Sequence, residues 1–221
     1  MRAMALSEKM RDYLKAIHSL RGSEERVAVS AVADQLGVAA ASVSNMVKRL
    51  ADLDLVRRTP YKGIELTEAG EQEALRLIRA HRLIELFLTE VVGLQWDEVH
   101  AEAERLEHAV SDRLVERIAE LLGHPTVDPH GDPIPTHEGL VDEEALPDLT
   151  ELEVGQRAEI RRVTAQDPAM LQYLSSMGLT PDKTITVMDK GPFEGPLTLL
   201  IDGAQRVIGW KVAREVQVVA I

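Results

Sequence analysis

Two imidazoles and two carboxylates between residues 100 and 108 are spaced so that a helix would bring them together. These residues are His100, Glu104, Glu107 and His108. In a helix they occupy positions i, i+4, i+7 and i+8 and project from one side. The apolar residues along the neighbouring edge are Val99, Ala103, Leu106 and Val110. Ionisable groups beside an apolar edge need a partner, and a divalent cation can be that partner. The alternative is an ordinary polar face, since 28% of the residues are charged.

Two more pairs of ligand-type residues lie outside this stretch. His81 and Glu85 stand at i and i+4 in a long helical pattern, which suits either a metal site or an ordinary stabilising pair. Asp128 and His130 lie in the proline-rich segment 124–135, which cannot be the interior of a helix. The chain has no cysteine, so thiolate sites, disulfides and cysteine nucleophiles are excluded. Oxygen and nitrogen ligands alone favour Mn(II), tolerate Fe(II), and do not exclude Zn(II) or Cu(II).

Length and charge indicate how many domains the chain has and which kinds of binding partner it suits. The 221 residues suit two or three modest domains. Residues 1–10 hold no apolar signal core and no apolar run reaches the roughly 18 residues of a membrane span, so we expect a cytoplasmic protein. The net charge of −12 argues against a protein that coats nucleic acid by charge alone. Residues 1–66, however, hold 11 Lys and Arg against 8 Asp and Glu, which allows a localised surface for anions.

The N-terminal part predicts a DNA-binding domain. A helix over 6–20 is followed by a helix that Ser30 caps and that runs to Leu36, a tight turn at Gly37, and a helix over 41–50. This order is a helix-turn-helix.

A basic β-hairpin over 55–66 follows as a wing. Short hydrogen-bonding side chains on the second helix can reach base edges, and the cations farther along the helix and in the wing can meet phosphates. The expected DNA-contacting residues are Ala41, Ser42, Ser44, Asn45, Lys48, Arg49, Arg57, Arg58 and Lys62.

The rest of the chain predicts more helices and then a small β-rich module. Thr67 is the expected cap of a helix that continues over 71–91. A helix over 114–122 has a larger apolar face than one small domain needs, which suits a dimer surface or simply core. Beyond a polar stretch, residues 152–221 alternate short β-branched runs with turns, which predicts a small β-barrel interrupted by one helix over 167–179.

The order of these motifs resembles the diphtheria-toxin-repressor family of metal-dependent transcriptional regulators. The motifs are the winged helix, His81-x3-Glu85, His100-x3-Glu104-x2-Glu107-His108, and Asp128-Pro-His-Gly-Asp-Pro-Ile-Pro135. The resemblance covers nearly the whole chain, because residues 152–221 are similar to the family's C-terminal SH3-like module, itself similar to the ferrous-transport A domain. It implies a homodimer that binds palindromic operators when Fe(II) or Mn(II) is bound and represses genes of metal uptake or storage.

The resemblance also implies a mainly α fold with a small β part. The expected domains are a winged-helix DNA-binding domain over 1–74, a helical metal-binding and dimerisation domain over 75–140, a linker over 141–151, and an SH3-like domain over 152–221.

Two metal sites per subunit follow from the resemblance. The primary, activating site matches Asp12, Glu104, Glu107 and His108. The ancillary site matches His81, Glu85 and His100, with Asp128 and His130 as further ligands from the proline-rich loop. Members with a carboxylate-rich primary site can also recruit His81 there.

Departures from the family pattern bear on the metal. Iron-sensing relatives have Met and Cys at the positions of Asp12 and Glu104, whereas manganese-sensing relatives have the acidic pair. One short manganese-sensing subgroup has Glu at the position of Lys15, so its bridged two-metal arrangement is not implied here. The usual ligands from the C-terminal module do not align, and the candidates there are Gln166, Asp167 and Glu159.

Other functions fit the pattern less well. A carboxylate di-iron enzyme needs paired Glu-x-x-His motifs, which this chain lacks, so we expect no enzyme. The nearer alternative is a winged-helix regulator that senses an organic ligand, with the Glu/His face simply in water. A peptide-binding role for the C-terminal module is disfavoured by an aromatic content of 3%.

Overall fold

The computed structural model describes the whole chain apart from residues 1–5, 22–25, 60–62 and 142–143. The chain divides into two compact units, which are Met1–Ala80 with Pro135–Leu140, and His81–Ile134 with Val141–Ile221. None of the helices in the described ranges has the length and apolar character that a membrane span requires.

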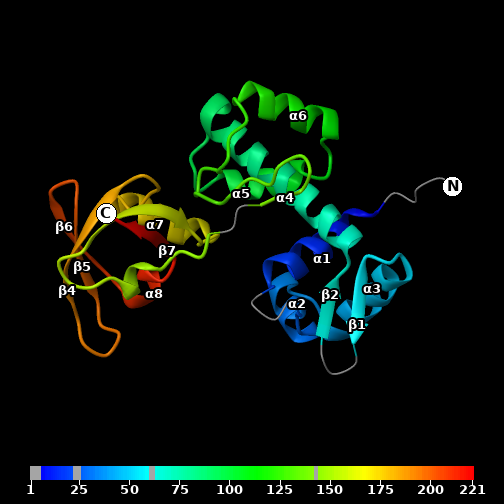
Figure 1. The fold of residues 1–221 in the computed structure, drawn as a ribbon, viewed down its shortest axis with the longest axis horizontal. Helices are drawn as coiled ribbons and strands as arrows, with labels where there is room; N and C mark the ends of the chain where they lie inside the picture. The colour runs from blue at the N-terminus through cyan, green and yellow to red at the C-terminus, as the bar shows by residue number, and fades with distance from the viewer. Residues whose placement is uncertain (1–5, 22–25, 60–62, 142–143) are drawn as a thin grey trace. The chain divides into compact units, whose positions relative to one another are not determined.

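The first unit contains a helix-turn-helix followed by a two-stranded hairpin (Figure 1). Its elements are α1 (Glu8–Ser19), α2 (Val29–Leu36), α3 (Ala40–Asp52), β1 (Val56–Thr59), β2 (Gly63–Leu66) and the first half of α4 (Glu68–Phe87). The two strands pair antiparallel, from Val56 opposite Leu66 to Thr59 opposite Gly63. The apolar faces of the helices meet in one core around Leu14 and Val47. The predicted order of helix, helix-turn-helix and wing is confirmed.

The predicted helix caps of this unit have different outcomes. Ala28 occupies the N-cap position of α2, with φ −71° and ψ 142°, and makes no side-chain capping bond. The helix therefore starts before Ser30, and the prediction that Ser30 caps it is wrong. Thr67 does cap α4, because its Oγ1 accepts the amide of Gly70 at 3.1 Å. Gly37 ends α2 with φ 62°, in the left-handed conformation expected at the tight turn.

The longest helix runs from the first unit into the second. α4 continues as a π-helical segment, η1 (Leu88–Val92), and ends at Gly93 with φ 85°. The predicted helix over 71–91 is confirmed and joins directly to its cap at Thr67. Near its start, a Cβ at Gly70 would lie 1.9 Å from the carbonyl oxygen of Leu55, so only glycine lets the helix pack on that backbone.

The stretch from His100 to His108 is not one continuous helix. α5 (Val99–Leu106) ends at Leu106, Glu107 is its C-cap, and His108 lies in the following turn. The chain tightens there, with the amide of Ala109 donating to the carbonyl of Leu106 at 2.9 Å. The prediction that the four ligand-type residues share one helical stripe is therefore wrong. Leu106 is 39% exposed, so it does not belong to a buried edge.

The next helix is strongly amphipathic. α6 (Asp112–Leu121) begins after Ser111, whose side chain accepts the amide of Leu114. Ile118 is buried, but Leu114 is 48% and Leu121 65% exposed. About half of the apolar face that the sequence predicts as dimer surface or core is thus open to solvent.

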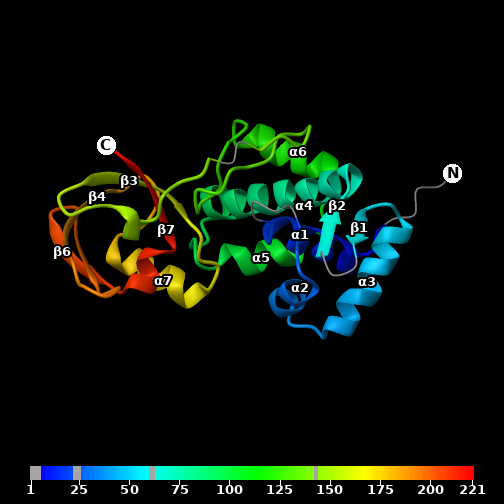
Figure 2. The same ribbon diagram turned by 60° about the horizontal axis from the view of Figure 1, so that its bottom comes forward.

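The C-terminal part of the second unit is a curved five-stranded sheet with two helices against it (Figure 2). Its elements are η2 (Leu149–Glu151), β3 (Arg157–Val163), α7 (Pro168–Met177), β4 (Thr184–Lys190), β5 (Leu197–Ile201), β6 (Ala204–Ile208), α8 (Trp210–Ala213) and β7 (Val216–Ala220). The strand order is β6-β5-β4-β3-β7, and β6 does not pair with β7 within the described residues. The small SH3-like β module expected over 152–221 is confirmed, and its sheet is open between β6 and β7.

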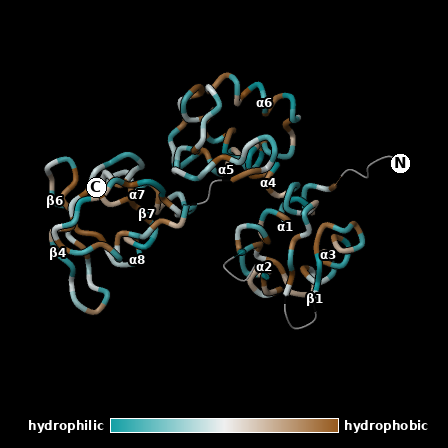
Figure 3. Tube along the Cα trace, in the orientation of Figure 1, coloured by the Kyte–Doolittle hydropathy of each residue, from teal (hydrophilic) through white to brown (hydrophobic). Residues whose placement is uncertain are grey.

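Alternating burial explains the core of this sheet. β5 alternates fully buried Leu197 and Leu199 with half-exposed neighbours, as a strand with one covered face should. In Figure 3 the C-terminal sheet is coloured by stretches of both hydrophobic and hydrophilic residues. The predicted helix over 167–179 is confirmed as α7, which Asp167 caps by accepting the amide of Met170 at 2.9 Å. The short helices η2 and α8 were not predicted, because each is only three or four residues long.

Candidate metal centre

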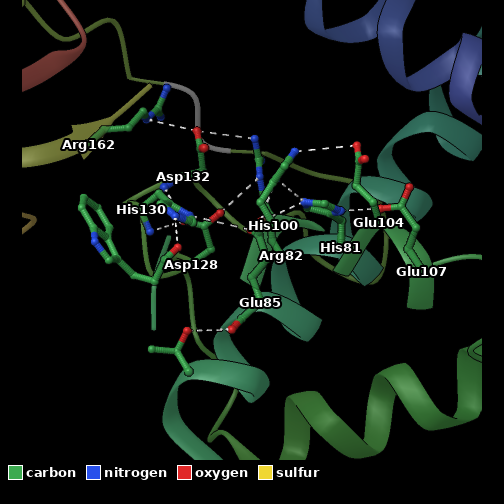
Figure 4. A network of polar contacts seen from close by, with 12 residues as sticks. His81, Arg82, Glu85, His100, Glu104, Glu107, Asp128, His130, Asp132 and Arg162 are labelled. Atoms are coloured by element: carbon green, nitrogen blue, oxygen red, sulfur yellow. Dashed lines mark hydrogen bonds and ion pairs between the residues drawn. The ribbon is translucent and has the colours of Figure 1, made fainter. Parts of the chain in front are cut away.

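Three side chains from α4 and α5 meet within hydrogen-bonding distance of one another (Figure 4). His81 Nε2 lies 2.9 Å from Glu85 Oε1 and 3.1 Å from His100 Nδ1. His100 Nδ1 lies 3.0 Å from the same oxygen of Glu85. His81 and Glu85 are one helical turn apart and are only 5% and 2% exposed. The structure thus brings together the three residues that the resemblance assigns to the ancillary site.

A second group forms where the proline-rich segment passes Glu85. His130 donates from Nε2 to the carbonyl of Trp96 at 2.9 Å, which leaves Nδ1 facing Glu85 Oε2 at 3.9 Å. Asp128 Oδ1 accepts the amides of His130 at 2.8 Å and Asp132 at 2.9 Å, so Asp128 also shapes its own loop. Ligand atoms of Glu85, Asp128 and His130 lie within 4.8 Å of one another. Glu85 is therefore common to both groups.

His81 also contacts the residues that follow α5. Its Nδ1 contacts Glu107 Oε2, and Glu107 Oε1 lies 3.6 Å from His108 Nε2. Glu107 is 5% exposed, so its carboxylate is almost entirely removed from water. One imidazole therefore contacts a carboxylate of each predicted site, Glu85 with one nitrogen and Glu107 with the other.

Glu104 differs from Glu107 in its exposure to solvent. The Glu104 side chain is 57% exposed and pairs with His100 Nε2 at 3.7 Å. Asp12 is half-buried on α1 in the first unit. The roles of Asp12 and Glu104 in the primary site stay predictions.

Burial and neighbouring charges shift two carboxyl groups in opposite directions. Burial alone would raise the pKa of Glu85, but hydrogen bonds from His100 and His81 outweigh burial and hold this pKa below its usual range. Burial raises the pKa of Asp128, and the negative charges of Asp132 and Glu85 raise it further. Neighbouring carboxylates that repel each other in a buried place are stabilised by a cation.

Several residues around the second group were not predicted from the sequence. The residues Asp128 to Pro133, called the ligand loop below, are held by two arginines. Arg82 donates to the carbonyl of Pro133, and its Nη2 lies 3.6 Å from Asp132 Oδ1. Arg162 Nε lies 3.6 Å from the same oxygen of Asp132. The position of Asp132 two residues after His130 is the one local signal, since the arginines come from distant elements.

The candidates from the C-terminal module have other surroundings. Asp167 caps α7, and Glu159 pairs with Arg161 at 3.1 Å. Gln166 is exposed. Among the described residues, none of the three joins a group of at least three His, Asp or Glu side chains with the spacing of metal ligands.

The predicted DNA-contacting residues lie mostly on the surface of the first unit. Ala41, Ser42, Asn45, Lys48 and Arg49 on α3 and Arg57 and Arg58 on β1 are exposed, Ser44 is half-buried, and Lys62 lies outside the described residues. Lys48 and Arg49 follow Asn45 by about one helical turn on α3, so polar and cationic groups are displayed together.

The buried ligand groups fit a divalent cation that prefers hard donors. Their ligand atoms are carboxylate oxygens and imidazole nitrogens, and within each group these atoms lie within 4.8 Å of one another. Carboxylates and imidazoles without sulfur suit Mn(II) and Fe(II) and also accept Zn(II).

Comparisons with known proteins cover nearly the whole chain. Residues 5–64 match the model of the iron dependent repressor N-terminal DNA binding domain, 67–136 match that of the iron dependent repressor metal binding and dimerisation domain, and 148–220 match the FeoA domain. The iron-dependent repressor IdeR of Mycobacterium tuberculosis is 34% identical over 210 residues, which are 88% of this chain and 89% of that protein.

Solved structures give the same result. A manganese-dependent transcriptional repressor in complex with manganese is 38% identical with a TM-score of 0.87, over 96% of this chain and 100% of that one. The structure of ScaR with bound Cd2+ is 33% identical with a TM-score of 0.82, over 96% of this chain and 99% of that one.

Proposed function

Because the chain belongs to the iron-dependent repressor family, we propose that it represses transcription by binding palindromic operator DNA as a homodimer when Mn(II), or alternatively Fe(II), is bound. The observation that supports this most directly is the buried set of imidazoles and carboxylates around Glu85, joined through His81 to Glu107. Two metal sites per subunit fit this arrangement. The regulated genes would be those of metal homeostasis, in the cytoplasm, and no catalytic role is proposed.

The acidic donors favour Mn(II) over Fe(II) as the signal. Every ligand candidate offers oxygen or imidazole nitrogen, and the primary set is rich in carboxylates. A relative in the comparison is manganese-dependent and another is iron-dependent, so both metals belong in the test.

The proposed switch connects the metal to the DNA-binding part. Asp12 belongs to α1, beside the helix-turn-helix, whereas Glu104, Glu107 and His108 belong to or follow α5. Bound metal would relieve repulsion among these carboxylates and tie α1 to α5. We propose that this selects the spacing of the two DNA-binding parts of a dimer, with half-sites about one helical turn apart. The exposed Leu114 and Leu121 of α6 suit the dimer surface.

Each predicted domain would have its own function. Residues 1–74 would bind DNA, with Ser42 and Asn45 of α3 reading bases and Lys48, Arg49 and the wing arginines contacting phosphates. Residues 75–140 would bind metal and dimerise. Residues 152–221 would form the SH3-like part, beyond a linker at 141–151.

A metal titration of DNA binding tests the function. We expect Mn(II) and, without oxygen, Fe(II) to increase affinity for a duplex selected from a random pool by about 5- to 150-fold, the usual range of such coupling. EDTA should reverse the effect, measured by fluorescence anisotropy at fixed ionic strength. Affinity that is indifferent to both metal and EDTA would contradict the proposal and favour the regulator of an organic ligand.

Replacing Asp128 by asparagine should stabilise the metal-free protein and weaken its response to metal. The pKa of Asp128 in the folded protein is raised, so its contribution to stability is present below the unfolded value of about 3.9 and is lost as pH rises through the folded value. Asparagine removes the charge and keeps an oxygen for the amides of His130 and Asp132. At pH 7.5 in EDTA we expect a higher melting temperature, by about 2–4 °C for each kcal/mol of repulsion removed.

The same melting experiment carries its own controls. The difference between Asp128→Asn and the natural protein should shrink toward pH 4, and Mn(II) should raise the melting temperature of the variant less. Asp34→Asn, on the exposed side of α2, should change neither value. A lower melting temperature in EDTA with an undiminished Mn(II) response would show that Asp128 is only a loop-shaping residue.

A further inference from the structure

The ligand loop of residues 128–133 is seated on β3 through backbone atoms. The amide of Val163 donates to the carbonyl of His130 at 2.8 Å. Next to it, a Cβ on Gly131 would lie 1.9 Å from the carbonyl oxygen of Arg161 and 2.9 Å from Arg162 Cα, and Gly131 has φ +86°. Only glycine permits this approach and this conformation. The loop that carries two metal-ligand candidates is therefore fitted to a strand of the C-terminal sheet.

The strand is irregular at the point where the loop is seated. The pairing of β3 with β7 shifts register between Ile160 and Arg162, which is a β-bulge. Bulges redirect side chains. Here Arg161 is exposed and pairs with Glu159 on its own strand, whereas the Arg162 side chain is only 17% exposed and pairs with Asp132 of the loop.

Asp132 lies between two cations from different elements. Its Oδ1 is 3.6 Å from Arg82 Nη2 of α4 and 3.6 Å from Arg162 Nε of β3 (Figure 4). Arg162 Nε is buried and makes no hydrogen bond within the described residues, so the carboxylate of Asp132 compensates the charge at this atom. The carboxylate of Asp132 in the loop therefore contacts both α4, which also carries Glu85, and β3.

We propose that Arg162 is a positioning residue for the metal centre, through which the C-terminal sheet holds the ligand loop so that His130 and Asp128 face Glu85. The C-terminal module then contributes the placement of ligands, and the placement is carried by Arg162, Asp132 and the backbone contact at Gly131. The carbonyl of His130 accepts the Val163 amide of β3, so a shift of the loop away from the strand would also move His130 Nδ1 away from Glu85. The inference rests on the proposed function for the role of the metal, but the holding of the loop does not require metal.

Two measurements on the full-length protein test this. Hydrogen exchange of the Val163 amide in EDTA reports whether the loop is seated, and a Mn(II) titration followed by the electron paramagnetic resonance of free Mn(II) reports affinity. We expect Arg162→Met to speed exchange of this amide and to weaken the site containing His130 by about 10- to 100-fold, the usual effect of removing a residue that orients ligands. Arg161→Gln, on the same strand with its side chain in solvent, should change neither.

A double-mutant cycle separates the ion pair from a general loss of charge. Arg162→Met and Asp132→Asn should each loosen the loop, and the double variant should be little worse than Asp132→Asn alone, because that substitution already removes the ion pair with Arg162 along with the one with Arg82. Additive effects, or unchanged Val163 exchange and Mn(II) affinity in Arg162→Met, would overturn the proposal. So would a loss of affinity in Gln166→Ala or Glu159→Ala that Arg162→Met does not produce, since the sheet would then supply a ligand directly. If metal fails to promote DNA binding while Val163 exchange responds as expected, the proposed function fails and the seating of the loop stands.

Discussion

Operator binding should lose its response to metal when Asp12, Glu104 and His108 are replaced together by alanine. These residues belong to the proposed primary site, and their removal leaves Glu107 as the one carboxylate there. Mn(II) should increase the DNA affinity of the natural protein by about 5- to 150-fold. In the triple variant this enhancement should disappear, so that the affinities in Mn(II) and in EDTA are equal. Fluorescence anisotropy with the selected duplex, in Mn(II) and in EDTA, measures both affinities.

The matched control replaces ordinary surface carboxylates near the same helix. Glu98→Ala/Glu102→Ala removes two acidic groups, one of which pairs with Arg105 at the surface. This variant should respond to Mn(II) like the natural protein. A metal response that survives in the triple variant would rule out the proposed switch. Circular dichroism and the melting temperature in EDTA show whether the triple variant is folded.

Replacing His81 should weaken both metal sites at once. A neutral imidazole has one N–H, so His81 can donate either to Glu107 through Nδ1 or to Glu85 through Nε2. If Nε2 binds metal, the hydrogen must lie on Nδ1 and point to Glu107, which orients that carboxylate. We therefore expect His81→Asn to lower the Mn(II) affinity of both sites by at least about 10-fold, measured by titration with detection of free Mn(II).

Two single variants give the comparison that this prediction needs. Glu85→Gln should weaken mainly the ancillary site, because Glu85 contacts only ligand candidates of that site, and His108→Ala should weaken mainly the primary site, because His108 contacts Glu107. A His81→Asn protein that loses only one class of site would contradict the bridging role. The melting temperature of each variant in EDTA shows whether it remains folded, which distinguishes ligand loss from unfolding.

The C-terminal part illustrates what local sequence leaves open. The short β-branched runs over 158–163, 184–188, 197–201, 206–208 and 215–219 predict all five of its strands within about two residues, because one covered face imposes a period of two. They do not predict whether the sheet closes into a barrel, since closure depends on pairing between the two edge strands β6 and β7, which the local pattern of neither strand determines. Short helices such as α8 also escape prediction, because four residues show no helical period.

The stretch from His100 to His108 shows the same limit at the metal centre. Its ligand types and helical spacing were visible in the sequence, but the end of α5 at Leu106 was not, because no glycine or proline marks it. Glu107, the C-cap of α5, contacts His81, whereas the Glu104 side chain is 57% exposed on the helix. The spacing of an ideal helix predicts one stripe of His100, Glu104, Glu107 and His108, but the turn after Leu106 takes His108 out of the helix.

The sequence by itself determined the family, the order of the elements and the ligand types, because these follow from local pattern and residue chemistry. His81 and Glu85 were paired by helical geometry alone. Tertiary structure decided which distant groups meet. His130 and Asp128 reach Glu85, and Arg162 reaches Asp132, through a loop seated on β3. Such contacts join residues tens of positions apart, and no local pattern encodes them because they depend on how packed elements approach.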